Sequence, residues 1–256
     1  MTYKISFANQ KGGVGKTSLT LHTSGALAEM NKKVLVIDMD QQGNLSSVFI
    51  DNIYALPLTV ADLLVEDGAN IKQVIQTTSF DNIDILPANL LLSDLEARLA
   101  GDDDAQFYLL EHLEEIDNNY DFILIDCPPS LGKTTRIALV ASNYVIIPIE
   151  CQEWAVKGSA QIISFIERVQ KRANTELSLI GFVINKFDSR RSIEASYQEV
   201  LRQKYQDKIF QTMFRNNVQY TEASTARLPI TKYLPHSDQA QAYRNFAKEI
   251  IAHVED

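Results

Sequence analysis

Short, mostly apolar runs recur along the chain and are separated by segments in which apolar residues follow a helical spacing. Such runs, four to six residues long, are typical of strands that are buried on both faces of a parallel sheet. The pattern predicts six strands: Ile5 to Ala8, Val34 to Ile37, Ile83 to Leu86, Phe122 to Ile125, Tyr144 to Ile149 and Leu179 to Ile184.

Helical periodicity falls between these runs. Apolar residues between Ile162 and Val169 share one face of a helix predicted for residues 155–172, and another helix is predicted for residues 18–30. Alternating strands and helices favour right-handed βαβ units, so the predicted fold is α/β, a doubly wound, mostly parallel sheet flanked by helices. Trp154 is expected to pack against a neighbouring helix or an interface. No repeat or linker divides the chain, and residues 1–256 are expected to form a single domain.

The composition limits the partners and the cellular compartment expected for this domain. The 33 acidic and 24 basic residues give a net charge of −9, which argues against a uniformly basic nucleic-acid-binding surface but permits a local basic patch. Cys127 and Cys151 form no C-x-x-C pair, so a reducing, cytoplasmic setting fits best. The start of the chain lacks the pattern of a signal peptide, no apolar run is long enough to span a bilayer, and no membrane partner is expected.

The first predicted strand leads into a glycine-rich stretch, NQKGGVGKTS, at residues 9–18. Its glycines allow backbone N–H groups to turn toward phosphate oxygens, and the following helix adds the partial positive charge of its N-terminus. Lys16 would then neutralise the β- and γ-phosphates, and the Thr17 hydroxyl would bind Mg²⁺. The usual pattern, G-x-x-x-x-G-K-[ST], is broken by Gln10 and does not account for a second lysine, Lys11.

Two predicted strands end in acidic residues, at the edge where sheets of this kind bind ligands. Asp126 follows the apolar run of FILIDCPPS, where a Walker-B aspartate would hold Mg²⁺ through its water shell. Asp38 and Asp40 follow another run in VIDMDQQGN, and one of them could orient the attacking water. An isolated Asp at a strand end is more often a cap or turn residue, but three beside a phosphate loop favour a nucleotide and Mg²⁺ site.

Three motifs together resemble the ParA/MinD family of deviant Walker ATPases, and within it the ParA or Soj partition ATPases: KGGVGKT with its leading lysine, DMDQQGN and IDCPPSLG. The resemblance continues in family order through NKFDSR (185–190), IFQT (209–212), YTEAST (220–225), LPITKY (228–233) and AYRNFAKEI (242–250). It covers nearly the whole chain and implies a P-loop NTPase fold of the SIMIBI type. The N-terminal helix-turn-helix domain of larger relatives is expected to be missing, because the chain starts at the first strand.

The resemblance also implies roles for individual residues. Lys11, Lys16 and Asp40 are the implied catalytic residues, with Asp40 positioning water and Asp38 in a supporting place. The Mg²⁺ residues are implied to be Thr17, Asp126 and Asp40. The implied contacts to ATP come from Lys11, Gly12, Gly13, Val14, Gly15, Lys16, Thr17 and Ser18, and at the adenine from Asn185 and Pro229. Segments 40–44 and 128–131 resemble switch regions that rearrange when the γ-phosphate leaves.

Lys11 gains an explanation from the same resemblance. In this family the leading lysine is the signature of an ATP-sandwich dimer, in which it reaches the phosphates of the nucleotide bound to the other subunit. A cation supplied in trans can offset phosphate charge that would otherwise oppose dimerisation in a poorly hydrated interface. An ATP-dependent homodimer is therefore expected.

The sequence departs from the family pattern in two places. In the motif DMDQQGN, Gln41 replaces a proline. In the C-terminal basic segment, Arg215 stands at a position where the family has proline, and Asn216 and Gln219 replace two arginines. In relatives such arginines help to bind DNA non-specifically. Segment 186–232 has nine basic and five acidic residues, which by itself is more typical of a solvated helix face. The implied DNA-binding residues are Arg190, Arg191, Arg202, Lys204, Lys208 and Arg215.

The resemblance implies an ATPase with weak intrinsic activity that a cargo-bound ParB-like partner stimulates, in the cytoplasm and on the nucleoid. The acidic stretch 94–121 is a candidate docking face for a basic segment of that partner. The cargo stays open between plasmid DNA, chromosomal DNA and a protein assembly. A MinD-like membrane-surface ATPase is the main alternative, although the acidic residues of the final AKEIIAHVED would be repelled by anionic lipid. Metal-cluster carriers and ATP-dependent carboxylation enzymes are more remote.

Overall fold

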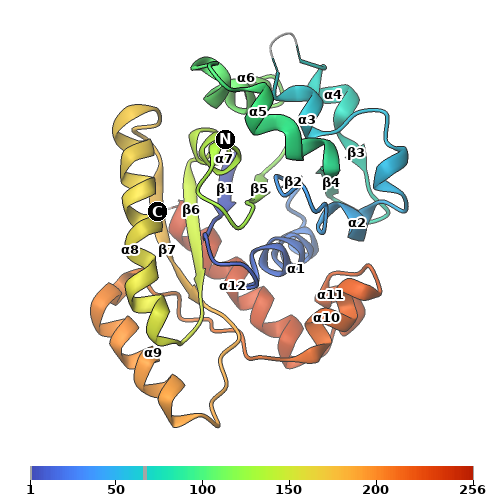
Figure 1. Ribbon diagram of the computed structural model, residues 1–256. Helices are drawn as coiled ribbons and strands as arrows, with labels where there is room; N and C mark the ends of the chain where they lie inside the picture. The colour runs from blue at the N-terminus through green and yellow to red at the C-terminus, as the bar shows by residue number, and fades with distance from the viewer. Residues whose placement is uncertain (1, 66–67, 256) are drawn as a thin grey trace.

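The computed structural model describes residues 2–65 and 68–255; the side chains of Glu96 and of residues 153–158, Trp154 among them, lie outside the described part. Within it, seven strands form one sheet in the order β3-β4-β2-β5-β1-β6-β7 (Figure 1). All neighbouring strands are parallel except β3, which runs antiparallel to β4. The strands are β1 (Tyr3–Phe7), β2 (Val34–Asp38), β3 (Gln76–Thr77), β4 (Ile83–Leu86), β5 (Phe122–Asp126), β6 (Tyr144–Ile149) and β7 (Ser178–Ile184).

Helices cover both faces of this sheet. Figure 1 shows α8 and α9 at the left, on the side of β7, while α3 to α6 lie across the top and α2 at the right. The α-helices are α1 (Lys16–Glu29), α2 (Ser46–Phe49), α3 (Val60–Leu63), α4 (Ile71–Val74), α5 (Leu95–Arg98), α6 (Tyr108–Glu114), α7 (Lys133–Val140), α8 (Glu153–Arg172), α9 (Ser192–Tyr205), α10 (Val218–Thr225), α11 (Ile230–Tyr233) and α12 (Asp238–Glu255). Short 3₁₀ turns are η1 (Ile53–Ala55), η2 (Leu90–Asp94), η3 (Asp104–Gln106) and η4 (Gln206–Lys208).

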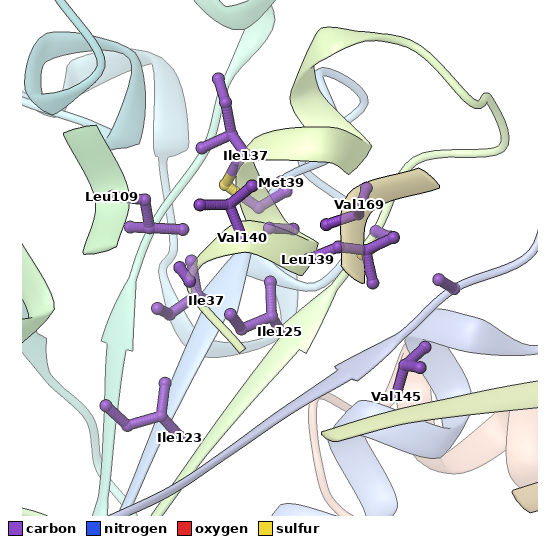
Figure 2. Close-up of a cluster of buried hydrophobic side chains, with 14 of the residues drawn as sticks. Ile37, Met39, Leu109, Ile123, Ile125, Ile137, Leu139, Val140, Val145 and Val169 are labelled. Carbon is purple, nitrogen blue, oxygen red and sulfur yellow. The ribbon is translucent and has the colours of Figure 1, made fainter. Parts of the chain in front are cut away.

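Each face of the sheet has its own hydrophobic core, because alternate residues of a strand point to opposite faces. On one face the central strands pack against α1 and α12, through buried residues that include Val34, Val36, Leu124, Leu27, Phe246 and Ile250. On the other face they pack against α6, α7 and α8 (Figure 2), through Ile37, Ile123, Ile125, Leu109, Ile137, Leu139 and Val169. Burial of each such side chain contributes about 1.5 to 3 kcal/mol, so both faces stabilise the sheet.

The predicted α/β architecture is confirmed, and all six predicted strands are present with ends within two residues of those expected. The two-residue edge strand β3 was not predicted, because its length is too short to give a hydrophobic pattern. The two predicted helices correspond to α1 and α8, each of which begins two residues earlier than expected. The single domain stays a prediction. Across the described residues, no helix is both long and apolar enough to cross a membrane.

The strand order decides which loops meet. Because β1 lies between β5 and β6, the turn that follows β1 has the C-terminal ends of both strands as neighbours. The end of β2 lies next to the end of β5, so that Asp38 is the register partner of Asp126. The glycine-rich stretch and the acidic strand ends are therefore gathered at one edge of the sheet, as expected for ligand binding in this architecture.

Candidate functional site

Residues 8–15 form the turn between β1 and α1, and both its ends are fixed by asparagines. Asn9 Nδ2 donates to the carbonyl of Pro148 (2.7 Å), while Asn9 Oδ1 accepts a hydrogen bond from the Lys11 backbone N–H (3.0 Å). At the other end, Gly15 has a φ of 95°, and a Cβ there would lie 2.1 Å from Asn185 Nδ2. No side chain caps the N-terminus of α1, which leaves its first N–H groups free to bind an anion.

A cavity of about 710 Å³ opens at this helix N-terminus. The turn and the start of α1 form one wall, and the loop after β2 contributes Asp40, Gln42 and Asn44. Most of the predicted nucleotide residues line it: Gly12, Gly13, Gly15, Lys16, Thr17, Ser18 and Asn185. Val14 is buried beneath the turn instead, so only its backbone belongs to the site. The cavity is large enough for a small-molecule ligand such as a nucleotide.

Lys16 is held inside this cavity. Its side chain is buried, and Nζ donates to the carbonyl of Lys11 (3.3 Å). Burial lowers the pKa of Lys16, and the nearby negative charge of Asp126 works against that shift. A buried ammonium group at the N-terminus of a helix is suited to bind a phosphate.

Asp126 at the end of β5 fits a bound Mg²⁺. Burial raises the pKa of Asp126 well above its usual range, and the charge of its register partner Asp38 raises it further. Neither carboxylate oxygen of Asp126 has a hydrogen-bond partner, although both are buried. Its neighbour Thr17 supplies a hydroxyl, so the two offer the oxygen donors that Mg²⁺ prefers. No group of three His, Cys, Asp or Glu residues could hold a metal ion in the described part, so phosphate and water would complete the coordination.

Asp38 supports the loop that carries Asp40. Asp38 Oδ1 accepts from the backbone N–H of Asp40 (3.0 Å), and Oδ2 accepts from both the N–H (2.9 Å) and the hydroxyl (2.7 Å) of Ser46. Burial raises the pKa of Asp38 to about 6. Asp40 itself also lines a neighbouring cavity of about 450 Å³ together with Pro128 and Pro129. The two predicted switch segments, 40–44 and 128–131, therefore line the same cavity, and Asp40 belongs to the first of them.

Lys11 is not among the residues that line the cavity that Lys16 occupies. Lys11 Nζ donates to Glu150 Oε2 (2.5 Å) and to Gln152 Oε1 (2.9 Å), in the segment that follows β6. The lysine side chain is 46% exposed. The two lysines of the turn therefore have separate surroundings.

The two predicted adenine contacts lie in different places. Asn185 at the end of β7 lines the cavity and donates from Nδ2 to the carbonyl of Val14 (2.7 Å). Pro229 packs against Gly25 of α1, where a Cβ would lie 2.4 Å from Pro229 Cβ, and it is not among the residues that line the cavity. Because α1 rises by about 1.5 Å per residue, residue 25 lies well away from the helix N-terminus, and the adenine contact of Pro229 stays a prediction. Arg215, which stands in a family proline column, lines the cavity with Asn216 and Asn217.

The six predicted DNA-binding residues do not share one element, and only two of them, Arg202 and Lys204, belong to α9. Arg190 and Arg191 precede the helix and are ion-paired with Asp188 (2.8 and 3.6 Å). Arg202 and Lys204 lie in its last turn, and the Lys204 ammonium sits 4.9 Å from the ring centroid of Tyr205. Lys208 Nζ donates to the carbonyl of Leu179 (3.3 Å). Arg215 lies at the nucleotide cavity, so it is placed differently from the other five.

Sequence reasoning missed Asn9, Glu150 and Gln152. Glu150 directly follows β6, so the rule that selected Asp38 and Asp126, a polar residue at the C-terminal end of a buried strand, would have selected it too. The partnership of Glu150 with Lys11 spans 139 residues and carries no local signal.

The comparisons with known proteins agree with this site. A family model described as "AAA domain" matches residues 2–179. The chain is 37% identical over 248 residues to the sporulation initiation inhibitor protein Soj of Bacillus subtilis (97% of this chain, 98% of that protein). It is 40% identical over 251 residues to the chromosome-partitioning ATPase Soj of Treponema pallidum (97% and 96%).

Among solved structures, cobyrinic acid a,c-diamide synthase from Mycobacterium smegmatis with bound ATP analog and magnesium is similar, with a TM-score of 0.87 and 29% identity (100% of this chain, 97% of that chain). Fold and site together define a P-loop ATPase. The chain belongs to the Soj/ParA family of chromosome-partitioning ATPases, as the motifs of its sequence predicted.

Proposed function

We propose that this chain is a partition ATPase that binds ATP and Mg²⁺ and cycles between a monomer and an ATP-sandwich dimer. Membership of the Soj/ParA family supports ATP hydrolysis and a part in DNA partition. The observation that carries the dimer is the separation of two lysines in one turn: Lys16 lines the cavity, whereas Lys11 lies outside it. Two lysines in separate surroundings can serve two different nucleotides.

In the proposed site the residues of one subunit bind and orient the nucleotide. The N–H groups of the turn and Lys16 bind the phosphates, and Thr17 and Asp126 hold Mg²⁺. When bound, Mg²⁺ neutralises charge on the phosphate oxygens as the terminal bond breaks. Asp40, whose loop is held by Asp38, orients the attacking water. Because segments 40–44 and 128–131 share a cavity, loss of the γ-phosphate contacts would loosen both together.

Lys11 would complete the site of a second copy. In a two-fold symmetric dimer, Lys11 of each copy would contact the nucleotide phosphates bound to the other copy. The interface would therefore contain two equivalent contacts. An ammonium group placed against phosphate oxygens in a closed interface offsets charge that would otherwise keep two ATP-loaded subunits apart. Without a γ-phosphate this attraction weakens, which would couple the dimer to ATP rather than to ADP.

The test compares the two lysines. Lys11→Ala should still bind a fluorescent ATP analogue but remain a monomer, because only the contact in trans is lost. Lys16→Ala should bind the nucleotide at least about 10-fold more weakly, because a charged hydrogen bond to phosphate is lost. Size-exclusion chromatography with light scattering measures the mass of each variant with ATP, with ADP and without nucleotide. An ATP-dependent dimer of undiminished strength in Lys11→Ala would contradict the proposal.

The dimer is further proposed to bind DNA without sequence preference and to release it when a ParB-like, cargo-bound partner stimulates hydrolysis. This would place the protein on the nucleoid in the cytoplasm. The basic residues along α9 support DNA binding, since a dimer presents each of them twice and phosphate contacts need no base sequence. Retardation of a duplex of arbitrary sequence should require ATP and weaken steeply as salt is added.

A further inference from the structure

A carboxylate lies between two lysines at the mouth of the nucleotide cavity. Glu150 Oε2 accepts the short hydrogen bond from Lys11 Nζ, and its other oxygen, Oε1, lies 3.9 Å from Lys186 Nζ. Lys186 lines the cavity, whereas Lys11 does not. Glu150 therefore joins a lysine that lines the nucleotide cavity to a lysine that does not.

Glu150 is held firmly enough to act as a fixed anchor. Its side chain is only 12% exposed, compared with 46% for Lys11 and 47% for Lys186. It directly follows β6, whose last residue, Ile149, accepts a hydrogen bond from the Asn185 N–H (2.8 Å). The more exposed partner in this contact is the lysine, so a rearrangement would move Lys11 rather than Glu150.

We propose that Glu150 is a positioning residue that holds Lys11 within its own subunit and competes for it with the phosphates of a nucleotide bound to a second copy. This inference rests on the proposed role of Lys11 in trans. One ammonium group cannot be fully paired with both anions at once, so each Lys11 leaves Glu150 when the dimer closes. Glu150 thereby raises the concentration of ATP-loaded protein that dimerisation requires.

Lys186 makes this exchange reversible. A buried carboxylate that loses its only counter-ion is strongly destabilising. Glu150 keeps Lys186 nearby after Lys11 has left, so its charge stays compensated. Gln152, which accepts the second hydrogen bond from Lys11 (2.9 Å), is neutral and leaves no charge behind. Lys11 can therefore leave Glu150 while the carboxylate of Glu150 keeps a nearby positive charge.

The first test measures the dimerisation constant with a non-hydrolysable ATP analogue by analytical ultracentrifugation. Glu150→Gln keeps the shape and removes the charge. An ion pair of this exposure contributes about 2- to 5-fold to an equilibrium constant, and a dimer releases two of them, so the dissociation constant should fall by about 4- to 25-fold. Glu29→Gln is the matched control, because Glu29 pairs with Arg244 on α12 and the change removes the same charge. It should leave dimerisation unaltered, and thermal melts should show both variants folded.

The tighter dimerisation of Glu150→Gln must also depend on Lys11. In the background of Lys11→Ala, Glu150→Gln should change dimerisation no further, since there is no lysine left to release. If Glu150→Gln weakens the dimer or leaves it unchanged while Lys11→Ala abolishes it, the inference is overturned and the proposed function survives. If Lys11→Ala dimerises normally, the proposed function itself fails.

A second measurement reads the contact in the monomer without nucleotide. Mass spectrometry follows acetylation of Lys11 by an amine-reactive reagent, relative to Lys33 as an internal reference. Release from Glu150 should raise the labelling of Lys11 several-fold in Glu150→Gln and not in Glu29→Gln. Equal labelling in all three proteins would overturn the inference whatever the dimer does.

Discussion

At the scale of single residues, Gly15 shows how closely the candidate site is specified. Its φ of 95° lies in the left-handed region, and Asn185 occupies the space where a side chain would begin. The same asparagine donates to the carbonyl of Val14, so Gly15 allows the end of β7 to contact the turn after β1. The glycine is needed for both its backbone conformation and its missing Cβ.

Gly15→Ala should therefore lower the free energy of unfolding by about 2 kcal/mol, since it adds backbone strain and a clash. It should also weaken ATP binding by more than about 10-fold, because the turn would be displaced. Denaturant unfolding and titration with a fluorescent ATP analogue measure the two effects.

Gly12→Ala is the matched control for stability. Gly12 has no positive φ, and the nearest atom to an added Cβ is Pro129 Cβ at an ordinary 3.8 Å. Its effect on unfolding should stay within about 0.5 kcal/mol. Equal losses of stability in the two variants would show that the conformation at Gly15 is not special.

At the scale of elements, the arginines at the two ends of α9 differ in their ion pairing. Before the helix, Arg190 donates to both oxygens of Asp188 (2.8 Å each), and the pKa of that carboxyl falls to about 2 beside the guanidinium. In the last turn, Arg202 has no ion pair among the residues that the structure describes. An unpaired cation contributes more to a positive surface potential than one that already has a counter-ion.

For the proposed DNA binding, Arg202→Ala should cost more affinity than Arg190→Ala. Each lost phosphate contact lowers the slope of log affinity against log salt by about 0.9, so Arg202→Ala should reduce it by about that amount per subunit. Fluorescence anisotropy with a duplex of arbitrary sequence, between about 50 and 200 mM salt, measures this slope. A larger loss from Arg190→Ala would place the DNA at the start of α9 instead.

At the scale of the whole molecule, His22 joins α1 to the C-terminal helices. It is fully buried, accepts a hydrogen bond at Nδ1 from the Ile230 N–H (3.1 Å), and packs against the rings of Tyr220 and Tyr243. Burial lowers the pKa of His22 from 6.5 to about 3. The imidazole is therefore neutral in the folded protein at pH values where the unfolded chain already binds a proton.

The contribution of His22 to stability should be complete above pH 6.5 and should fall by about 1.4 kcal/mol for each pH unit between 6.5 and 3. The raised pKa values of Asp38 and Asp126 increase the free energy of unfolding as the pH falls, which is the opposite of the effect of His22. The effect of His22 is therefore measured as a difference between two proteins that both contain these carboxyls. Unfolding of the wild type is compared with that of His22→Gln from pH 7 to about 4. A difference that does not change with pH would mean that folding does not lower the pKa of His22.

The sequence alone was sufficient for six of the seven strands of the sheet, the α/β class, the phosphate turn and the two acidic strand ends. These features depend on residues close together in the chain, through the period of a strand, the φ that only glycine adopts readily and the start of a helix. The family motifs added the expected roles of Lys11, Lys16 and Asp126. None of this required knowledge of which strands are neighbours.

Only the tertiary structure decided which distant residues meet. The order of the strands places Asp126 in register with Asp38, and it brings Glu150, which is 139 residues away, onto Lys11. Nor does any local pattern reveal that Pro229 packs on the middle of α1 or that Arg215 lines the cavity. Such contacts follow from the packing of the whole sheet and its helices, because the position of a side chain in space depends on every element between it and its partner.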